Sequence, residues 1–449
     1  MKCRFFVLIG IVCLFLAVFT TRPVQAQTLE TLYTFTGYPD GANPWNDLLL
    51  DVNGTLYGTT SIGGVNGYNV FGVNGVGAVY ELNNKGKETV LYSFCALANC
   101  ADGYWPESNL LQDWQGNLYG VAVHGGNTTA TNCTTTYTYG CGVVYKLDKK
   151  GNLTVLYAFT GGTDGNIPQG LTMDWAGNLY GITFWGGDLS CSTPNNPPGC
   201  GVVYKVDTKG NFTVLYTFTG GADGAFPTDY LTLDWAGNIY GVTLYYGNLA
   251  HCSGCGYGTV FKLDKKGKLT TLYTFTGGAD GATAAPPLVL DIWGNLYGAT
   301  AYGGDTSTCN APNGCGVVYK LTAAGTFSVL HTFTGAPDGA EPPMGLIGDL
   351  FGNLYGVTQY GGNSADCTWG APNLPGCGTV FKVDTWGHET VLYTFTGSTD
   401  GAYPGTTPIM DWQGNLYGDT FYGGDYSCYN EGIFSPEGCG VVYKLSPGR

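Results

Sequence analysis

Three short phrases recur seven times along the chain, and this repetition is the strongest constraint on the fold. The phrase Leu-Tyr-x-Phe-Thr-Gly, with departures at Cys95 and His331, begins at Leu32, Leu91, Leu156, Leu215, Leu272, Leu330 and Leu392. The phrase Gly-Asn-Leu-Tyr-Gly, with small variations, begins at Gly54, Gly116, Gly177, Gly237, Gly294, Gly352 and Gly414. A third phrase, close to Gly-Val-Val-Tyr-Lys-Leu, begins at Gly77, Gly142, Gly201, Gly258, Gly316, Gly378 and Gly440. Copies are 57 to 65 residues apart, which predicts one structural unit repeated seven times.

Each unit is predicted to form four antiparallel strands, which we call A to D. In the third unit we expect them at Gln169–Asp174, Asn178–Trp185, Gly201–Asp207 and Phe212–Thr219. The A–B and C–D connections are short and carry the Asp and the Gly-Asn that tight hairpin turns require. Four-stranded units of this length are typical of the blades of a β-propeller.

The two ends of the chain indicate how the ring would close. The first predicted strand is a strand D at Leu29–Thr36, and the last is a strand C at Gly440–Leu445. We therefore predict an all-β, seven-bladed β-propeller of four-stranded antiparallel blades, closed by the N-terminal strand joining the last blade. Such a closure would leave no free sheet edge there.

The first 26 residues have the pattern of a secretory signal peptide. Lys2 and Arg4 precede the apolar run Phe5–Phe19, and a small-residue cleavage site ends at Ala26. No later segment reaches the 18 apolar residues of a membrane span. We expect residues 27–449 to form a single propeller that is secreted or extracytoplasmic, without a membrane span.

The repeated phrases also carry a family resemblance. Gly-Asn-Leu-Tyr-Gly-x-Thr-x-x-Gly-Gly and Gly-x-Val-Tyr-Lys-Leu resemble the GloVer tandem repeat of exported bacterial proteins, over residues 28–445. The resemblance implies an extracytoplasmic bacterial protein. It brings no activity and no catalytic residue with it.

Charge excludes several classes of partner. Charged residues make up 11% of the chain, against roughly 25% in a typical soluble domain. The net charge is −15, and it becomes −18 when Lys2, Arg4 and Arg22 are removed with the signal peptide. Nucleic acid and anionic membrane surfaces are therefore disfavoured as partners. Every lysine after residue 26 lies on a strand C or around a C–D turn, so the opposite end offers no cation for phosphate, sulfate or uronate groups.

The cysteines after residue 26 number fourteen and fall into seven local pairs. Six pairs lie in B–C loops and one in the D–A loop after the first blade: Cys133/Cys141, Cys191/Cys200, Cys252/Cys255, Cys309/Cys315, Cys367/Cys377, Cys428/Cys439 and Cys95/Cys100. In an exported chain this predicts seven loop disulfides. The His251-Cys252-x-x-Cys255 spacing also fits a redox motif or half a metal site, but its register with the other pairs favours a disulfide.

The long B–C and D–A loops share one end of the predicted ring, which we call the loop end; the A–B and C–D turns form the turn end. Function usually resides in long loops on a rigid scaffold. Two sets of positions at the loop end are rich in rings. The set that ends strand B is Ile62, His124, Trp185, Tyr245, Tyr302, Tyr360 and Tyr422. The set that opens strand A is Asn43, Trp105, Ile167, Phe226, Thr283, Glu341 and Tyr403.

Aromatic side chains without cations suit a neutral sugar or an apolar group. The predicted ligand contacts are Trp105, His124, Trp185, Phe226, Tyr245, Tyr302, Tyr360, Tyr403 and Tyr422. Packing between blades is the alternative explanation for these rings. The tyrosines of the Gly-Asn-Leu-Tyr-Gly phrases are assigned to the core instead, at Tyr57, Tyr119, Tyr180, Tyr240, Tyr297, Tyr355 and Tyr417.

An Asp-Gly pair recurs in every D–A loop, at Asp40, Asp102, Asp164, Asp223, Asp280, Asp338 and Asp400. A ring of carboxylates could hold Ca²⁺, because hard cations prefer such oxygens. The interpretation we favour is an Asp-Gly turn whose side chain accepts bonds from its own backbone. We expect no other cofactor.

Catalytic residues in a repeat protein break its symmetry, because one site needs one acid and one base. Glu107, Glu341 and His124 are the candidates, with His251, Asp229, Glu431 and Glu437 also in or beside the loop end. Two carboxylates such as Glu107 and Glu341 could act as acid and base on a glycoside. No Ser-His-Asp arrangement or zinc-ligand spacing is present in the sequence.

The sequence thus predicts an exported, non-catalytic and monomeric binding module. Its expected partner is a neutral glycan or a cell-surface protein, recognised through the acidic, aromatic-rich loop end. The alternative is a glycoside hydrolase- or lyase-like enzyme acting on neutral polysaccharide. A purely structural envelope protein is a third possibility.

Overall fold

The computed structural model describes residues 27–448 except for residues 45, 66–68, 71–72, 130–132, 134–139, 192–197, 246–255, 308, 310–312, 363–366, 368–373 and 427–437. The predicted signal peptide at residues 1–26 lies outside the described residues, as do His251, Cys252, Cys255, Cys428, Glu431 and Glu437.

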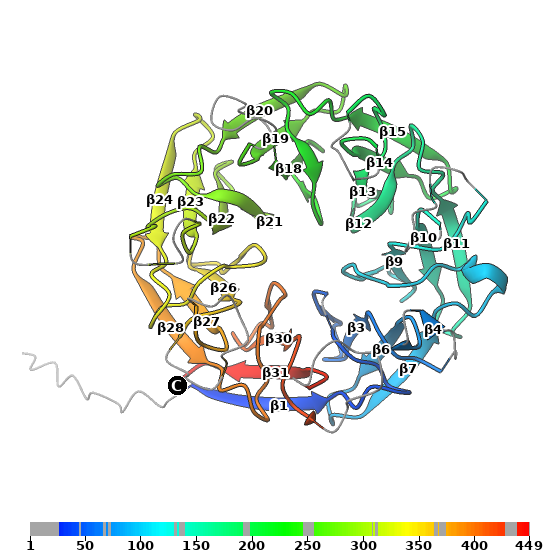
Figure 1. The fold of residues 1–449 in the computed structure, drawn as a ribbon, viewed down its shortest axis with the longest axis horizontal. Coiled ribbons are helices and arrows are strands. Elements are labelled where there is room, and N and C mark those ends of the chain that lie inside the picture. Colours follow the sequence, from blue (N-terminus) through cyan, green and yellow to red (C-terminus); the bar gives the residue numbers. More distant parts are fainter. Residues whose placement is uncertain are drawn as a thin grey trace, which may run out of the picture.

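Seven small antiparallel sheets stand in a ring and form a seven-bladed β-propeller (Figure 1). Blade 1 consists of β2 (Leu49–Leu50), β3 (Leu56–Thr60), β6 (Ala78–Leu82) and β7 (Glu88–Ser93). Blade 2 consists of β8 (Leu111–Gln112), β9 (Leu118–Ala122), β10 (Val143–Leu147) and β11 (Leu153–Ala158). Blade 3 consists of β12 (Asn166–Met173), β13 (Leu179–Trp185), β14 (Val202–Val206) and β15 (Phe212–Thr217). Blade 4 consists of β16 (Ala225–Pro227), β17 (Thr232–Leu233), β18 (Ile239–Tyr245), β19 (Thr259–Leu263) and β20 (Leu269–Thr274). Blade 5 consists of β21 (Ala282–Leu290), β22 (Leu296–Tyr302), β23 (Val317–Leu321) and β24 (Phe327–Thr332). Blade 6 consists of β25 (Ile347–Gly348), β26 (Leu354–Thr358), β27 (Thr379–Val383) and β28 (Glu389–Thr394). Blade 7 consists of β29 (Ile409–Met410), β30 (Leu416–Thr420), β31 (Val441–Ser446) and β1 (Thr28–Thr34).

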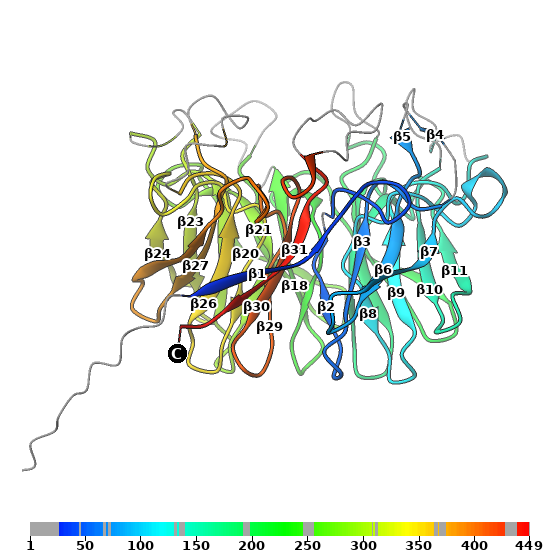
Figure 2. The ribbon, with the colours of Figure 1, turned by 90° about the horizontal axis from the view of Figure 1, so that it is seen from below.

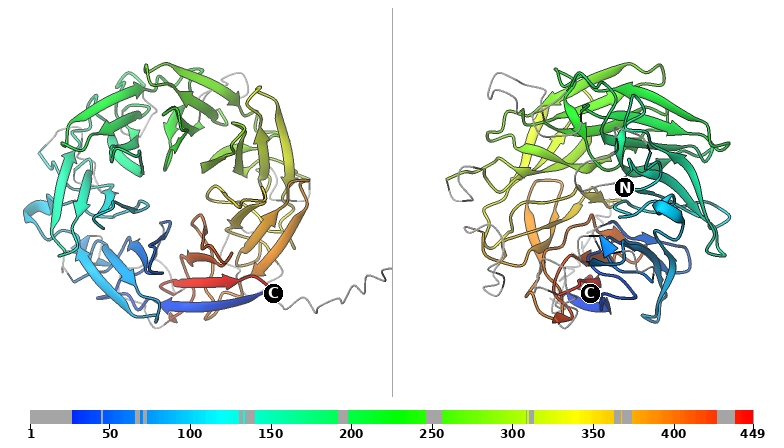
Figure 3. Two further views of the ribbon diagram at one scale, coloured as in Figure 1. Left: turned by 180° about the vertical axis from the view of Figure 1, so that it is seen from behind. Right: turned by 45° about the vertical axis from the view of Figure 1, so that its right-hand side comes forward.

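The N-terminal strand is the outer strand of blade 7. β1 pairs antiparallel with β31, with Thr28 opposite Ser446 and Thr34 opposite Val441. Figure 3 shows these two strands side by side, although they come from opposite ends of the sequence. The predicted pairing between the first strand and the last unit is therefore present.

The ring has two different ends. In the side view of Figure 2 the A–B and C–D turns lie at the lower end, and the longer connections lie at the upper end. The upper, loop end also carries the short hairpin of β4 (Asn69–Val70) and β5 (Val73–Asn74). The 3-10 helix η1 (Ala98–Cys100) lies in the D–A connection between blades 1 and 2. In blade 3, strand A begins three residues earlier than predicted, because Asn166 and Pro168 already pair with β13 before a bulge.

The core of each blade is built on a buried ring of strand C. In blade 3 the ring of Tyr204 is fully buried and meets Phe159 edge-on, with 5.2 Å between centroids. Its hydroxyl occupies the space beside Gly181, where a Cβ would overlap Tyr204 Oη. The glycine that ends Gly-Asn-Leu-Tyr-Gly is therefore required by the tyrosine of strand C.

The tyrosines of the Gly-Asn-Leu-Tyr-Gly phrases are not fully in the core, contrary to the prediction. Except for Tyr240, they are half-buried. Tyr180 illustrates the reason, because its hydroxyl donates to the carboxylate of Asp174 in the A–B turn over 3.0 Å. Lys205 Nζ lies over the same ring, 5.4 Å from its centroid. The phenol thus joins the turn to the sheet and keeps its polar edge near water.

Five of the seven predicted disulfides are confirmed: Cys95–Cys100, Cys133–Cys141, Cys191–Cys200, Cys309–Cys315 and Cys367–Cys377. In the part of the chain that the structure describes, no helix is long and apolar enough to cross a membrane. Disulfides at this density fit an extracytoplasmic protein.

The other two predicted pairs are not confirmed. Cys252 and Cys255 both lie outside the described residues, and so does Cys428, the predicted partner of Cys439. Cys439 itself takes part in a disulfide and is only 2% exposed. As predicted, it lies in the B–C connection of blade 7, between β30 and β31. Its carbonyl accepts a bond from Asn43 N, and its side chain packs in the core where blades 7 and 1 meet. The pairing of Cys439 with Cys428 therefore stays a prediction.

Candidate functional site

The Asp of each D–A loop is a structural anchor. Asp164 accepts bonds from Tyr157 Oη at 3.0 Å, from Thr160 N at 2.8 Å and from Thr160 Oγ1 at 2.6 Å. The same tyrosine-to-aspartate bond recurs for Tyr33–Asp40, Tyr92–Asp102, Tyr216–Asp223, Tyr273–Asp280 and Tyr393–Asp400. Among the described residues, no group of three His, Cys, Asp or Glu side chains is arranged to hold a metal ion. The carboxylates proposed for Ca²⁺ therefore bond to their own loops, one in each blade.

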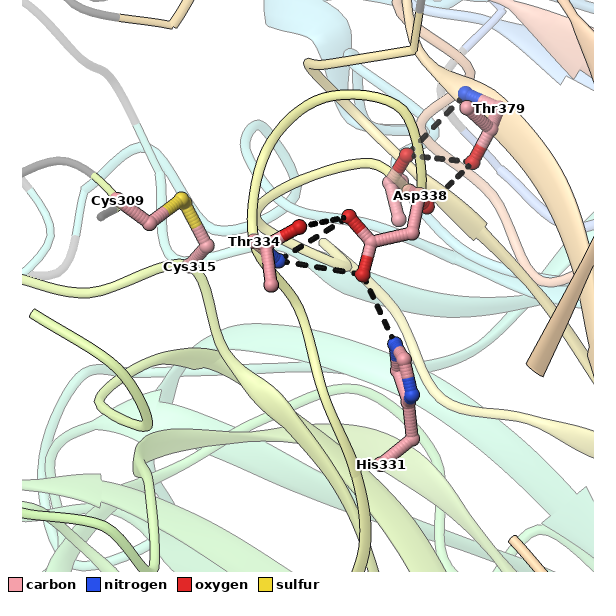
Figure 4. Close-up of polar contacts among 7 residues, drawn as sticks. Cys309, Cys315, His331, Thr334, Asp338 and Thr379 are labelled. Atoms are coloured by element: carbon pink, nitrogen blue, oxygen red, sulfur yellow. Dashed lines mark hydrogen bonds and ion pairs between the residues drawn. A yellow bond between two sulfur atoms is a disulfide. The ribbon is translucent and has the colours of Figure 1, made fainter. Parts of the chain in front are cut away.

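One anchor differs in chemistry. His331 replaces the tyrosine and places Nε2 3.0 Å from Asp338 Oδ2, while Thr334 Oγ1 donates to Oδ1 over 2.7 Å (Figure 4). Burial disfavours the ionised form of Asp338, but the bonds from His331 and Thr334 outweigh it and lower the pKa of Asp338. The Cys309–Cys315 disulfide packs against this loop, since a Cβ at Gly335 would lie 3.2 Å from Cys309 Sγ.

The residues predicted to open strand A share an unusual backbone, although in blades 1, 2, 6 and 7 strand A begins later, at β2, β8, β25 and β29. All seven of them have positive φ, between 53° and 57°: Asn43, Trp105, Ile167, Phe226, Thr283, Glu341 and Tyr403. This conformation is costly for residues other than glycine, above all for β-branched ones. Its consequence is an inter-blade bond, in which Ile167 N donates to the Cys141 carbonyl and Tyr403 N to the Cys377 carbonyl of the preceding blade. The disulfides therefore fix acceptors that hold neighbouring blades together.

The predicted ligand-binding rings of the loop end form a belt between blades. Tyr403 packs edge-on against Tyr360 at 5.3 Å and Tyr422 at 5.6 Å, and Phe226 meets Tyr245 at 5.9 Å. His124, Phe226 and Tyr403 are buried, and Trp105, Trp185, Tyr302, Tyr360 and Tyr422 are half-buried. Tyr245 is exposed, at 42%. Packing of these rings on one another, within blades 4 and 7 and between blades 6 and 7, thus accounts for part of this belt.

The three catalytic candidates lie in different places. Glu341 is buried in the belt beside Tyr302, whose pKa is raised to about 12 by burial and by the nearby Glu341 carboxylate. Burial lowers the pKa of His124 to about 4, so its imidazole is neutral at pH 7. Glu107 belongs to blade 2 and Glu341 to blade 6, on opposite sides of the ring, and the carboxylate whose pKa Glu107 raises is that of Asp229.

A second group of carboxylates lies near the axis of the ring, in the segments that lead into the innermost strands. We call Asp47, Glu107, Asp229, Tyr230 and Thr407 the axial cluster. Thr407 N of blade 7 donates to Asp47 Oδ1 of blade 1 over 2.7 Å. Asn46 Nδ2 donates to the carbonyl of Pro106, the residue before Glu107, over 2.9 Å. These bonds join the segments of three blades.

Tyr230 of blade 4 completes this cluster from across the ring. A Cβ at Gly170 of blade 3 would overlap Tyr230 Cδ1 and would lie 3.0 Å from Asn109 Oδ1 of blade 2. The phenol also interacts with the Asp47 carboxylate. Blades 1 and 4 are not neighbours, so this interaction crosses the centre of the ring. Only a residue without a side chain at position 170 leaves room for the ring of Tyr230.

Burial is the main influence on the axial carboxylates. It raises the pKa of Asp47, of Glu107 and of Asp229 to about 7 each, and repulsion from Asp47 and Glu107 adds to the shift of Asp229. Asp229 also has a positive φ, of 48°. The residues at the equivalent position in the other six units do not have positive φ. At pH 7 the cluster therefore shares protons among its carboxylates.

The turn end carries a ring of exposed large side chains that the sequence analysis missed. In every A–B turn the residue after the Asp is large and apolar, with exposed fractions from 79% to 103%: Val52, Trp114, Trp175, Trp235, Ile292, Leu350 and Trp412. Four of these seven residues are tryptophans, and we call the whole set the indole face. The signal was present in the sequence, because a solvent-facing turn tip that is apolar in all seven copies is not explained by turn chemistry. Two of these side chains, Trp175 and Trp235, stack on each other, and an exposed apolar patch of this kind marks a candidate interaction site.

A groove accompanies part of the indole face. It spans blades 3, 4 and 5 and has a volume of about 1240 Å³. Trp175 and Trp235 form one wall, with rings stacked at 5.8 Å and 14°. Thr232, Asp264 and Lys265 add polar groups to the lining. The groove therefore offers two parallel aromatic faces beside hydrogen-bonding groups.

Comparison with known families gives one match. A model described as the Gloeobacter/Verrucomicrobia repeat matches residues 17–193, 128–308 and 197–434. Among curated protein sequences there is no match.

Solved structures show the same fold at low identity. A catalytically inactive virginiamycin B lyase from Staphylococcus aureus, solved with quinupristin, has a TM-score of 0.53 and 12% identity, covering 94% of this chain and 99% of the other. The extracellular domain of a putative hybrid two component system from B. thetaiotaomicron has a TM-score of 0.50 and 12% identity, covering 95% of this chain and 43% of the other. A gluconolactonase from Xanthomonas campestris has a TM-score of 0.41 and 12% identity, covering 94% and 91%. At such identity the first two similarities establish the propeller fold alone.

Proposed function

The chain belongs to the Gloeobacter/Verrucomicrobia repeat family, and from this premise we propose that it is an exported binding propeller that holds a neutral glycan on its turn end. The observation that carries the proposal is the stacked pair of exposed indoles, Trp175 and Trp235, beside the groove. The five disulfides support the extracytoplasmic location.

The chemistry of the groove fits a sugar chain. Indole rings present a broad apolar face that can cover the C–H face of a pyranose while polar groups beside it bond the hydroxyls. The turn carboxylates do not compete, because Asp174 already accepts bonds from Ala176 N, Asn178 N, Asn178 Nδ2 and Tyr180 Oη. The groove is lined by charges of both signs, from Lys205 and Lys265 and from Asp174, Asp234, Asp264 and Asp291, so neutral hydroxyl groups can find donors and acceptors there.

Replacing both Trp175 and Trp235 by Ala is expected to weaken glycan binding at least tenfold. Each indole supplies about 1 kcal/mol of stacking beyond its buried area, and about 1.4 kcal/mol corresponds to a factor of ten. The measurement is isothermal titration of residues 27–449 with neutral hexasaccharides of glucose, xylose and mannose. Trp386→Ala is the matched control, because Trp386 is 81% exposed on a C–D turn and does not line the groove.

The same titrations separate the other candidate surfaces. A loss of affinity with Tyr245→Ala, and none with the double variant, would move the site to the loop end. Release of new reducing ends from the same sugars would favour the hydrolase- or lyase-like alternative. Unchanged sugar affinity in both variants would refute binding through either aromatic surface.

A further inference from the structure

The tryptophans of the A–B turns are not spread evenly around the ring. Blades 2 to 5, which follow one another, each carry one in this turn, with exposed fractions from 75% to 90%: Trp114, Trp175, Trp235 and Trp293. We call these four residues the tryptophan arc. The A–B turns of blades 1 and 6 contain Val52 and Phe351 instead, and blade 7 has Trp412 between them. One side of the turn end therefore differs from the other.

The backbone of the A–B turns does not explain the tryptophan arc. In blade 3, Gly177 N donates to the Asp174 carbonyl over 2.9 Å and closes the turn. In blade 1, which has no tryptophan in this turn, Gly54 N donates to the Asp51 carbonyl over 3.1 Å in the same way. The turn thus forms with or without an indole. Large exposed rings that the fold does not need indicate an interaction surface.

The groove of the turn end runs along this arc. Its lining includes residues 172–176, 231–237 and 290–292, which belong to the A–B turns of blades 3, 4 and 5 and the strand residues beside them. The groove has a volume of about 1240 Å³. Pockets for one drug-sized molecule have roughly 300–1,000 Å³. The groove therefore has room for several sugar units in a row, passing from blade to blade.

The ring imposes a shape on any chain that follows these turns. The A–B turns stand around the axis, one in each blade (Figures 1 and 2). A straight line meets a circle at two points at most, so an extended chain can cover two of the four turns. A chain that bends in one direction can stay over all four. Glucose units joined by β-1,4 bonds form extended ribbons, whereas β-1,3 and α-1,4 bonds give chains that curve.

We propose that the ligand of the turn end is a linear, curved polysaccharide of neutral sugars, such as a β-1,3- or α-1,4-linked glucan, that follows the tryptophan arc from blade 2 to blade 5. This inference rests on the glycan proposal above and adds the length and the shape of the ligand. Trp175 and Trp235 make the central contacts beside the groove. Trp114 and Trp293, at the two ends of the arc, contact only chains that are long enough to reach them.

The first test varies the chain length and the linkage. Residues 27–449 are titrated in a calorimeter with β-1,3- and α-1,4-linked glucose oligosaccharides of three and six units, and with the β-1,4-linked hexasaccharide. We expect at least one curved hexasaccharide to bind about tenfold more tightly than its trisaccharide, because each further sugar adds a stacking contact. The β-1,4-linked hexasaccharide is expected to bind more weakly than that curved one.

The second test removes one end of the arc. Trp114→Ala is expected to weaken binding of the curved hexasaccharide at least threefold and to leave binding of the trisaccharide unchanged. Trp412→Ala is the matched control, because Trp412 occupies the same turn position in blade 7 and is 91% exposed, against 90% for Trp114. It should change neither affinity. Substitutions at exposed turn tips have small effects on stability, and thermal melting establishes that both variants are folded.

The outcomes separate this inference from the glycan proposal. Equal affinities for three and six units, a β-1,4-linked hexasaccharide that binds as tightly as the curved ones, or equal effects of Trp114→Ala and Trp412→Ala would overturn the curved-chain inference and leave glycan binding in place. If no sugar of any length or linkage binds the folded parent, the glycan proposal fails and this inference fails with it.

Discussion

Replacing Asp164 by Ala is expected to lower the free energy of unfolding by about 3 kcal/mol. The carboxylate is buried and accepts bonds from Tyr157 Oη, Thr160 N, Thr160 Oγ1 and Gly162 N. Without it, four donors of one D–A loop lose their acceptor, and each bond to a charged group contributes about 1.5 kcal/mol or more, although such bonds are not additive. Equilibrium unfolding in guanidinium chloride, monitored by tryptophan fluorescence, measures the loss.

Asp207→Ala is the control for this prediction. Asp207 lies in the C–D turn of the same blade and also accepts three bonds, from Lys209 N, Asn211 N and Asn211 Nδ2. These bonds are at the surface, where water replaces them, so a much smaller loss is expected. Equal losses from the two variants would refute the anchoring role of Asp164. A loss that a chelator reproduces in the parent protein would instead favour the Ca²⁺ interpretation of the D–A loops.

The repeat made most of the fold predictable. Seven copies of three phrases located the strands, because each phrase pairs a strand with its turn residues, and the N-terminal strand D was readable from its phrase at Leu32. Local cysteine pairs predicted disulfides for the same reason, since their partners are 5 to 10 residues apart in the five pairs described. Strand starts were less certain, because pairing before a bulge, as at Asn166, depends on the neighbouring strand.

The candidate sites were harder to predict than the fold. The interaction between Asp47 and Tyr230 joins residues of non-adjacent blades, and no local pattern encodes a contact across the ring. Glu341 shows the opposite kind of error. It breaks the repeat, which made it a candidate catalytic carboxylate together with Glu107, but in the structure it is buried beside Tyr302 in the belt of rings. Asp419 was detectable, because it occupies a slot where other units have Val, Ile, Ala or Thr. Comparing equivalent positions between units reveals such departures better than searching for motifs.

The axial carboxylates should make the protein less stable as pH rises. The pKa of Asp229 is about 7 in the folded protein, against an ordinary value of 3.8. Between these values the folded protein keeps a proton that the unfolded chain has lost, so the free energy of unfolding falls as pH rises through this window. Above pH 7 both states are ionised at this group and the loss is complete. Asp47 and Glu107 shift in the same direction.

Asp229→Asn is therefore expected to stabilise the protein by about 2 kcal/mol at pH 8 and to have little effect at pH 4. A shift of about three pH units corresponds to about 4 kcal/mol, and roughly half remains because Asp229 is partly exposed to solvent. Guanidinium unfolding at pH 4, 6 and 8 measures the dependence. Asp174→Asn is the matched control with the opposite sign: burial opposes ionisation of Asp174, but bonds from Asn178, Tyr180 and Ala176 lower its pKa, so this substitution should destabilise at pH 8. A stabilisation by Asp229→Asn that is the same at pH 4 and pH 8 would contradict a buried, repelled carboxylate. The expected gain means that the parent sequence retains a destabilising charge at the axis of the ring, which natural sequences keep as long as the fold stays above its stability threshold.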